Sequence, residues 1–494
     1  MVTVNIGMLH YVLDHVYGAF VHRTKISPPF FSRGWGGTKL DLLERLIKQL
    51  FPEVEGQNWP PTLVQPIWTT VWETKTACLR EGVFRTPCDE QILSALPPEC
   101  HNARVAFLSP KLVPPEKMAC VVHLAGTGDH TFERRLRLGG PLLKENIATM
   151  VLESPFYGKR RPMLQRGAKL LCVSDLLLLG RATIEEARSL LYWLDTEEGY
   201  GKMGVCGLSM GGVHAAMVGS LHPSPVATLP FLSPHSAVVA FCEGILKHAT
   251  AWEALREDLA VQKGAMTLEE VRERLRHVLS LTDVTRFPIP KNPNACIFVA
   301  ATDDGYIPKH SVLELQRAWP GSEVRWVTGG HVSSFLLHNG EFRKAIVDGL
   351  NRLQWKESSL MSRMDSLDLQ IRRQTLELGI IARLCRKLLY VVPAFEVDSS
   401  MPLEHGFQYL EGDVLFITLN SSASCHYTLG EVRIKSWIKP VLICTRFSCA
   451  APGLLGPVRL LLPGSPTGKD ILATAKEDCH MLVASSSLLG LSRR

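Results

Sequence analysis

The sequence predicts an α/β fold in which a mostly parallel central sheet is flanked by helices, with a helical lid insertion and an irregular C-terminal extension. From about Met118 onward, short continuous apolar runs alternate with segments of helical periodicity. Most of these runs end at glycine or polar residues, as strands do before a loop. Continuous apolar runs are typical of parallel strands that are buried on both faces, and their alternation with helices is that of βαβ units.

The individual elements follow from the same patterns. The expected strands cover residues 119–125, 147–153, 203–207, 227–232, 296–301 and 324–327, and the expected helices include 182–194 and 213–220. Because an open parallel sheet binds its ligands at the carboxyl ends of its strands, we expect the chemical residues in the loops that follow these runs.

The chain divides into three parts. Residues 1–115 carry several tryptophans among many prolines, and we expect an N-terminal helix and an ordered arm packed on the core. Residues 116–356 are the expected core, in which the helical insertion at 243–286 covers the pocket as a lid. Residues 357–494 begin with helical spacing but show no sustained period from Pro393 onward. We expect this tail to be peripheral or poorly ordered and assign it no chemistry.

Composition excludes several classes of protein. With 494 residues, 46% of them hydrophobic, the chain can bury a large core and is not intrinsically disordered. The net charge of +6 is mild, and the basic residues are interleaved with acidic ones, which argues against a nucleic-acid partner. The 13 cysteines form no Cys-x-x-Cys pair, and Cys120, Cys206 and Cys296 lie in apolar runs. They indicate free thiols in a reducing, intracellular compartment, with no zinc site.

The N-terminal residues do not have the pattern of a signal peptide, because they lack a basic start and His10, Asp14 and His15 interrupt the apolar residues. Residues 7–22 nevertheless have helical spacing, with an apolar face formed by Leu9, Val12, Leu13, Val16 and Phe20. Two interpretations of this amphipathic helix remain open: it packs on the domain, or it makes a peripheral contact with a membrane.

A second apolar run, at 170–179, is divided by Asp175 and is too short to cross a bilayer. We therefore expect no transmembrane helix. The expected location is cytoplasmic, or peripheral on an organelle membrane.

The segment Gly207-Leu208-Ser209-Met210-Gly211 matches the pattern Gly-x-Ser-x-Gly. It follows an expected strand and opens an expected helix, which is the context in which this motif marks a nucleophilic serine. The serine of such a nucleophile elbow sits on a sharp, strained turn, where side chains on the neighbouring glycines would collide with the strand or the helix. Ser209 is therefore the predicted nucleophile.

A serine hydroxyl needs a base, and the base needs a carboxylate to orient it. His331 in Gly329-Gly330-His331 follows the last expected strand and is the best candidate for the base. Two acids, Asp303 and Asp304, follow the strand at 296–301. We favour Asp304, which precedes the hydrophobic-proline pair Ile307-Pro308 by three residues, over Asp303. The resulting chain order of Ser, Asp and His is that of α/β-hydrolases.

The oxyanion of an acyl-transfer reaction needs at least two aimed donors. We expect one from the amide of Met210 and the other from the amide of Thr127, in the loop after the first expected strand, where Gly126 lets the backbone approach the substrate. Asp129 and His130 in the same loop are expected to hold its shape.

The expected substrate-binding residues are Gly126, Phe156 and Leu232. Phe156 and Leu232, together with Phe241 and Leu246 of the lid and loops, indicate an apolar acyl chain.

Taken together, these motifs resemble the α/β-hydrolase superfamily and, within it, the α/β-hydrolase domain-containing protein 18 subfamily. The resemblance covers about residues 31–350 and lies in the segments 32–37, 123–130, 207–212, 319–326 and 329–333. Many relatives carry His-Gly where this chain has Ala125-Gly126. The resemblance implies an acyl-ester or lipid hydrolase with the triad Ser209, Asp304 and His331. The tail beyond about Leu360 has no counterpart in it.

Three functions remain open at this point. The first is a serine hydrolase of small-molecule or lipid esters, and the second is a serine peptidase or acyltransferase with the same triad. The third is a ligand receptor without catalysis, which is disfavoured because such proteins usually lose the histidine or the acid. Metal-ligand spacing, a phosphate loop and a dinucleotide fingerprint are not visible, so we expect no cofactor and no metal.

Overall fold

The computed structural model describes residues 6–23, 28–48, 59–355, 409–410, 414–420, 425–432, 442–449 and 458–459. They belong to two compact units, Met1–Ser358 and Ser359–Arg494. Within the described ranges, no helix combines the length and the apolar character that crossing a membrane requires.

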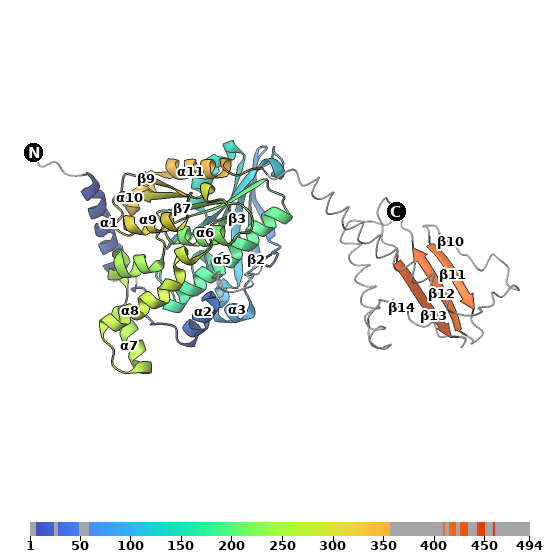
Figure 1. The fold of residues 1–494 in the computed structure, drawn as a ribbon, viewed down its shortest axis with the longest axis horizontal. Coiled ribbons are helices and arrows are strands. Elements are labelled where there is room, and N and C mark those ends of the chain that lie inside the picture. The colour runs from blue at the N-terminus through green and yellow to red at the C-terminus, as the bar shows by residue number, and fades with distance from the viewer. Residues whose placement is uncertain are drawn as a thin grey trace, which may run out of the picture. The chain divides into compact units, whose positions relative to one another are not determined.

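The first unit is built around a nine-stranded sheet (Figure 1). The strands follow one another across the sheet in the order β1 (Ile67–Glu73), β2 (Ala77–Arg85), β3 (Asn102–Pro110), β5 (Ile147–Leu152), β4 (Ala119–Leu124), β6 (Lys202–Leu208), β7 (Ala227–Phe231), β8 (Ile297–Ala301) and β9 (Glu323–Val327). From β5 to β9 all neighbours are parallel, whereas β1, β2, β3 and β5 pair antiparallel. The predicted mostly parallel sheet is confirmed.

The strands at the centre of the sheet are buried on both faces. Every residue of β4 and β5 is buried, which explains their continuous apolar sequences. Alternate residues of β4 serve the two faces: Cys120 and Val122 belong to one core cluster, and Ala119 and Val121 to a second. Both faces of the sheet therefore carry a packed core.

The antiparallel strands β1 to β3 lie in the part that was expected to be an arm. The sequence analysis assigned no strands there, because tryptophans and prolines obscured the short alternating runs. β1 is the edge strand and is almost entirely exposed, while β3 is mostly buried against its neighbours. The sheet thus extends into the N-terminal part of the chain.

Eleven helices are described, and several of them pack on the sheet (Figure 1). They are α1 (Ile6–Arg23), α2 (Thr38–Lys48), α3 (Glu90–Ala95), α4 (Glu133–Gly139), α5 (Val173–Thr196), α6 (Met210–Leu221), α7 (Trp252–Lys263), α8 (Leu268–Leu279), α9 (Lys309–Ala318), α10 (His331–Leu337) and α11 (Asn339–Asn351). Residues of α5 and α6 contribute to the first core cluster and residues of α11 to the second. The two sets of helices therefore pack on different sides of the sheet.

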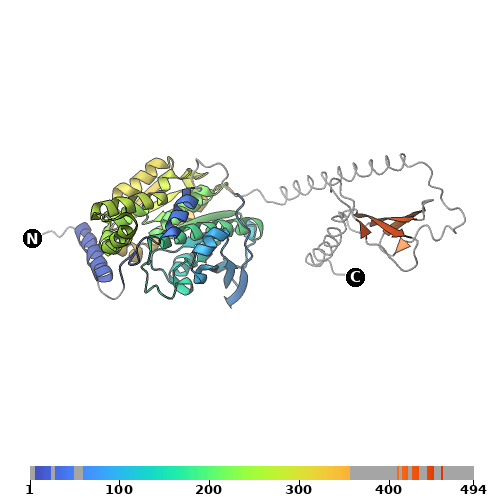
Figure 2. The same ribbon diagram turned by 90° about the horizontal axis from the view of Figure 1, so that it is seen from below.

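The insertion between β7 and β8 is helical, as expected. It contains η5 (Val239–Glu243), η6 (Ile245–Ala249), α7, α8, η7 (Ser280–Thr282) and η8 (Val284–Arg286). α8 begins at a capping box, in which Thr267 and Glu270 each accept a hydrogen bond from the other's backbone N–H. Figure 2 shows α1 beside this insertion, and the contacts of α1 include η6.

Buried cysteines are part of the first unit. Cys120, Cys206 and Cys296 are buried free thiols, as the sequence predicted. Burial raises the pKa of Cys296 to about 12, so this thiol stays protonated and unreactive at neutral pH.

The described residues of the second unit form a five-stranded antiparallel sheet. Its strands are β10 (Tyr409–Leu410), β11 (Val414–Asn420), β12 (Cys425–Val432), β13 (Leu442–Cys449) and β14 (Val458–Arg459), paired in that order. The sequence analysis assigned no element to this region, because a run such as β11 is apolar at most positions and shows no alternation. The helical spacing over 358–391 lies outside the described residues.

Candidate active site

Ser209 occupies the turn between β6 and α6. Its φ of 54° and ψ of −119° lie where residues other than glycine are rarely found. A Cβ on Gly207 would come within 2.2 Å of the carbonyl oxygen of Gly211, and one on Gly211 within 2.6 Å of the Leu124 carbonyl oxygen. The steric reason inferred for the two glycines is therefore present. The Ser209 N–H donates to the carbonyl of Phe231 on β7 at 2.8 Å, which ties the turn to the neighbouring strand.

His331 and Asp304 form a partly buried hydrogen-bonded pair. Nδ1 of His331 lies 2.8 Å from Oδ2 of Asp304, and the two side chains are 14% and 3% exposed. Oδ1 of Asp304 accepts the backbone N–H groups of Tyr306 and Ile307, both at 2.8 Å. Because two amides fix one carboxylate oxygen, the other is directed at the ring. This arrangement favours the tautomer with the proton on Nδ1 and leaves Nε2 as an acceptor.

Asp303, the alternative acid, makes different contacts. Its Oδ2 accepts the hydroxyl of Thr302 at 2.6 Å, and its backbone N–H donates to the carbonyl of Gly329 at 2.9 Å. The carboxylate that meets the histidine ring is thus the one that the spacing before Ile307-Pro308 favoured.

Sheet topology explains why these residues converge. β6, β7, β8 and β9 are consecutive parallel neighbours, so their carboxyl ends lie at one edge. Ser209 follows β6, Asp304 follows β8 and His331 follows β9. Among the described residues no hydrogen bond joins the hydroxyl of Ser209 to His331. Contacts of this kind are often long before a substrate binds.

The pKa of His331 reflects opposing effects. Burial of the ring lowers it, whereas the charge of Asp304, the hydrogen bond to Asp304 and the charge of Asp14 raise it. The net effect is a pKa above the ordinary value of imidazole. A more basic imidazole is a better proton acceptor, but a larger fraction of it is protonated near neutral pH.

The expected oxyanion residues lie at the same place. Thr127, Ser209 and Met210 line one cavity, and the hydroxyl of Thr127 lies 3.7 Å from the sulfur of Met210. A Cβ on Gly126 would come within 2.9 Å of the Leu208 carbonyl oxygen, so the loop passes close to the turn of the serine. This close approach explains the glycine at position 126.

A buried arginine that the sequence analysis did not identify holds this loop. Arg135 forms an ion pair with Asp129 at 2.9 Å and donates to the carbonyls of His123, at 3.2 Å, and Leu152. Nδ1 of His130 accepts the backbone N–H of Gly158 at 3.1 Å. Asp129 and His130 therefore make the loop-shaping contacts expected of them.

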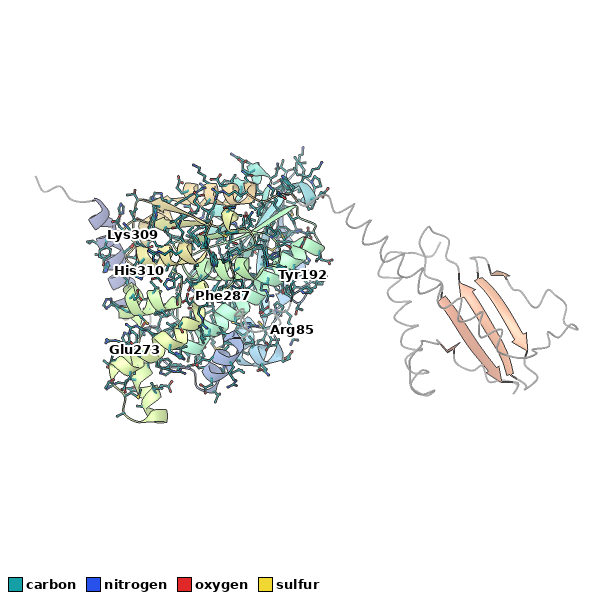
Figure 3. All side chains as sticks on the ribbon, in the orientation of Figure 1. Arg85, Tyr192, Glu273, Phe287, Lys309 and His310 are labelled. Atoms are coloured by element: carbon teal, nitrogen blue, oxygen red, sulfur yellow. The ribbon has the colours of Figure 1, made fainter. Side chains whose placement is uncertain are left out.

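The cavity at Ser209 is mainly apolar. Its lining includes Leu177, Ile184, Met217, Phe241, Leu246 and Phe287, the last of which is labelled in Figure 3. Side chains of Arg181 and His214 add polar groups to its wall. Many of the lining residues come from α5, α6 and the insertion, and others come from α2 and from loops.

Two expected substrate-binding residues are not part of this lining. Phe156 and Leu232 are both 1% exposed and both have positive φ, at 65° and 47°. Phe156 packs into the first core cluster, and Leu232 into the second, together with Phe231. Apolar character in a loop after a strand indicated a pocket, but the turn at each position directs the side chain into the core. Gly126 lies beside the turn of Ser209 but is also not part of the cavity lining.

Asp14 of α1 contacts both loops that carry the His331–Asp304 pair. Its Oδ2 accepts the backbone N–H groups of Gly305 at 3.0 Å and His331 at 2.6 Å, and its Oδ1 accepts that of Val332 at 2.9 Å. The sequence analysis treated Asp14 only as an interruption of an apolar stretch. A single acid within an otherwise apolar helix was the signal that could have identified it.

The side of α1 that faces the unit therefore differs from the apolar face that the sequence predicted. The buried Asp14 faces the unit, while large apolar side chains of the helix are exposed: Tyr11, Val12, Leu13, Val16 and Tyr17. The expected apolar face thus points largely outward for the side chains that the structure describes.

Within the described part of the chain, no cluster of three or more His, Cys, Asp and Glu side chains has the arrangement of a metal site.

The mostly parallel sheet, with a strained serine after β6 and a carboxylate and a histidine after later strands, defines an α/β-hydrolase fold. The chain belongs to the family described as alpha/beta hydrolase domain containing 18, whose model matches residues 28–352, more than half of its length. The family to which the sequence was found similar is therefore confirmed.

Solved structures with a similar fold include several esterases. An acetyl xylan esterase from Paenibacillus sp. R4 is 15% identical, with a TM-score of 0.43, over 65% of this chain and 97% of that chain. Acetyl xylan esterase 1 from Thermoanaerobacterium sp. JW/SL YS485 is 10% identical, with a TM-score of 0.41, over 65% of this chain and 96% of that chain. These likenesses do not assign an activity to this chain.

Proposed function

We propose that this protein is a serine hydrolase that cleaves carboxylic esters of lipids or other acyl compounds through an acyl-enzyme on Ser209. The observation that carries the proposal is the hydrogen-bonded His331–Asp304 pair, at the same sheet edge as the strained serine turn. An apolar cavity adjoins that turn.

In the first half of the reaction, the Ser209 hydroxyl attacks the ester carbonyl and its proton passes to Nε2 of His331. Asp304 keeps the Nδ1 proton in place and stabilises the imidazolium that forms. The amides of Met210 and Thr127 donate to the oxyanion of the tetrahedral intermediate. The imidazolium then returns its proton to the leaving alcohol, and the acyl-enzyme remains.

In the second half, water repeats the same steps. His331 takes a proton from the water, the hydroxide attacks the acyl carbonyl, and the proton returns to Ser209 as the acid leaves. Every proton that moves is thus taken up and released by one imidazole. No cofactor is required for this sequence.

The substrate class follows from the cavity. Its lining of Leu, Ile, Met and Phe side chains offers an acyl chain an apolar surface, and each methylene buried there contributes about 0.8 kcal/mol. We infer that esters with long acyl chains are preferred. Turnover of p-nitrophenyl esters from acetate to palmitate measures this preference as a rise in kcat/KM with chain length.

Labelling with a fluorophosphonate probe tests the nucleophile. Wild-type protein is expected to react with the probe, and Ser209→Ala is expected not to react. Ser220→Ala, on the same helix α6 with its hydroxyl bonded to the carbonyl of Met217, is the matched control and should label normally. Labelling that survives in Ser209→Ala would place the nucleophile elsewhere.

Three other functions give different results in the same assays. A peptidase would cleave peptide amides faster than esters and show no rise with acyl length. An acyltransferase would give an ester or amide product whenever an alcohol or amine acceptor is added, at the expense of the free acid. A ligand receptor without catalysis would turn over none of these substrates.

A peripheral contact with a membrane is a second proposal, and it rests on α1. The exposed Val12 and Val16 lie four residues apart and therefore on one side of this helix. We expect the double variant Val12→Ser/Val16→Ser to sediment less with phospholipid vesicles than wild type. Val261→Ser, at an exposed apolar position of α7, is the control. Equal sedimentation of the double variant and wild type would exclude this contact.

A further inference from the structure

Outside the proposed triad, the carboxylate of Asp14 contacts both loops that carry Asp304 and His331. We propose that Asp14 is a positioning residue, which holds the loop after β8 and the loop after β9 together so that His331 stays aligned with Asp304. This inference rests on the catalytic roles proposed above for His331 and Asp304. It adds a contribution from α1, which precedes the residues matched by the family model.

The hydrogen bonds of Asp14 span both loops. Gly305 directly follows Asp304, and its N–H donates to Asp14, as do the N–H groups of His331 and Val332. Three backbone N–H groups thus converge on one fully buried side chain, whose two carboxylate oxygens accept all three. The carboxylate of Asp14 therefore fixes the backbone of Gly305, which follows Asp304, and the backbone of His331.

Glycines in the loops after β8 and β9 allow α1 to pack closely against them. A Cβ on Gly330 would come within 2.6 Å of Oδ2 of Asp14 and 2.8 Å of the carbonyl oxygen of His10. Gly330 has a φ of −91°, which any residue adopts, so its lack of a side chain is explained by this close contact. A Cβ on Gly305 would likewise meet Asp14 and His15 at 3.2 Å. α1 and the two loops thus fit one another at two glycines.

Asp14 also acts on the base through its charge. The titratable groups around His331 are Asp304 and Tyr306, both of the loop after β8, and Asp14 of α1. The ring centre of Tyr306 lies 4.9 Å from that of His331. On the α1 side, His15 lies beside Gly305, and Tyr17 acts electrostatically on Tyr306. Asp14 is one of the causes that raise the pKa of His331. Loss of its charge should therefore lower the pKa at which activity falls on the acid side.

The variant Asp14→Asn tests the proposal. An amide in place of the carboxylate keeps the shape, but its NH₂ group must face at least one of the three backbone donors and leave it without an acceptor. We expect kcat/KM to fall about tenfold or more, and the acid limb of its pH profile to move to lower pH. Asp41→Asn, at an exposed position of α2, is the matched control for both measurements.

A purely structural role would lower the amount of active enzyme without moving the acid limb. An unchanged acid limb in a folded Asp14→Asn protein would overturn the proposal, whether or not kcat/KM falls. Probe labelling separates this failure from a failure of the triad. If wild type labels and Ser209→Ala does not, the proposed nucleophile stands whatever Asp14→Asn shows.

A second variant leaves the carboxylate in place. Gly330→Ala should push α1 away without removing any charge, so kcat/KM and the acid limb should change in the same direction as in Asp14→Asn. If Asp14→Asn does not fold, this variant carries the test, and an acid limb at the wild-type position would refute the role of Asp14.

Discussion

Replacing Asp304 by Asn should disable the base while leaving the fold intact. In the native site Oδ2 accepts from Nδ1 of His331, and Oδ1 accepts from the amides of Tyr306 and Ile307. The asparagine has one oxygen for these two positions. If the oxygen keeps the two amides, the NH₂ group faces the ring, and Nδ1 must become an acceptor. The proton then moves to Nε2, which can no longer take the proton of Ser209.

The opposite orientation of the asparagine is less favourable in free energy. Its oxygen would meet the ring, but its NH₂ group would face two backbone donors at 2.8 Å, leaving both without an acceptor. The first orientation therefore dominates, and it imposes the wrong tautomer. In a serine protease the same change lowers kcat about 10⁴-fold through the tautomer, and we expect a loss of about 10³- to 10⁴-fold here.

Hydrolysis of a p-nitrophenyl ester measures this loss directly. Asp303→Asn is the matched control, because Asp303 is the adjacent acid and contacts the hydroxyl of Thr302 rather than the ring. We expect this control to keep kcat/KM within about threefold of wild type, as expected when no group acting on the base is lost. A larger loss in Asp303→Asn than in Asp304→Asn would refute the assignment of the acid.

Three further predictions concern pH, stability and the cavity. As the proposed base, His331 must be neutral to accept a proton, so kcat/KM should fall about tenfold per pH unit below its raised pKa, as a pH profile would show; a flat acid side would contradict this. Glu186→Ala leaves the buried Arg160 without its ion-pair partner at 2.5 Å and should lower the free energy of unfolding by about 3–5 kcal/mol in a urea titration, more than Glu186→Gln. Leu246→Asp places a carboxylate in the cavity lining and should lower kcat/KM for palmitate far more than for acetate; equal losses would argue against acyl binding there.

Local patterns in the sequence predicted the serine turn and the pair of residues that would support it. Gly207 and Gly211 were expected from the sterics of a sharp turn, and the distances that a Cβ would have at both positions agree. Asp304 was favoured over Asp303 from spacing alone, and its side chain is the one that meets His331. The turn geometry agrees with the expectation because it concerns a short segment whose conformation its own residues impose, whereas the contact of Asp304 with His331 depends on the neighbouring strands β8 and β9. The catalytic roles of these residues stay predictions.

Side-chain direction could not be read in the same way. Leu232 and Phe156 follow strands, as pocket residues do, but positive φ values turn both into the core. Nothing in their neighbours along the chain reveals a left-handed conformation at a residue other than glycine. Much of the actual lining comes from α5, α6 and the insertion, which only packing brings to one place.

The sequence by itself determined the α/β fold, the order of its chemical residues and the strained position of Ser209, because periodicity, glycines and strand ends are local properties. The tertiary structure decided which face of α1 turns inward. Helical periodicity predicts an apolar face but does not state what covers it. In the structure the buried side of α1 includes Asp14, because three backbone N–H groups of loops far along the chain donate to its carboxylate.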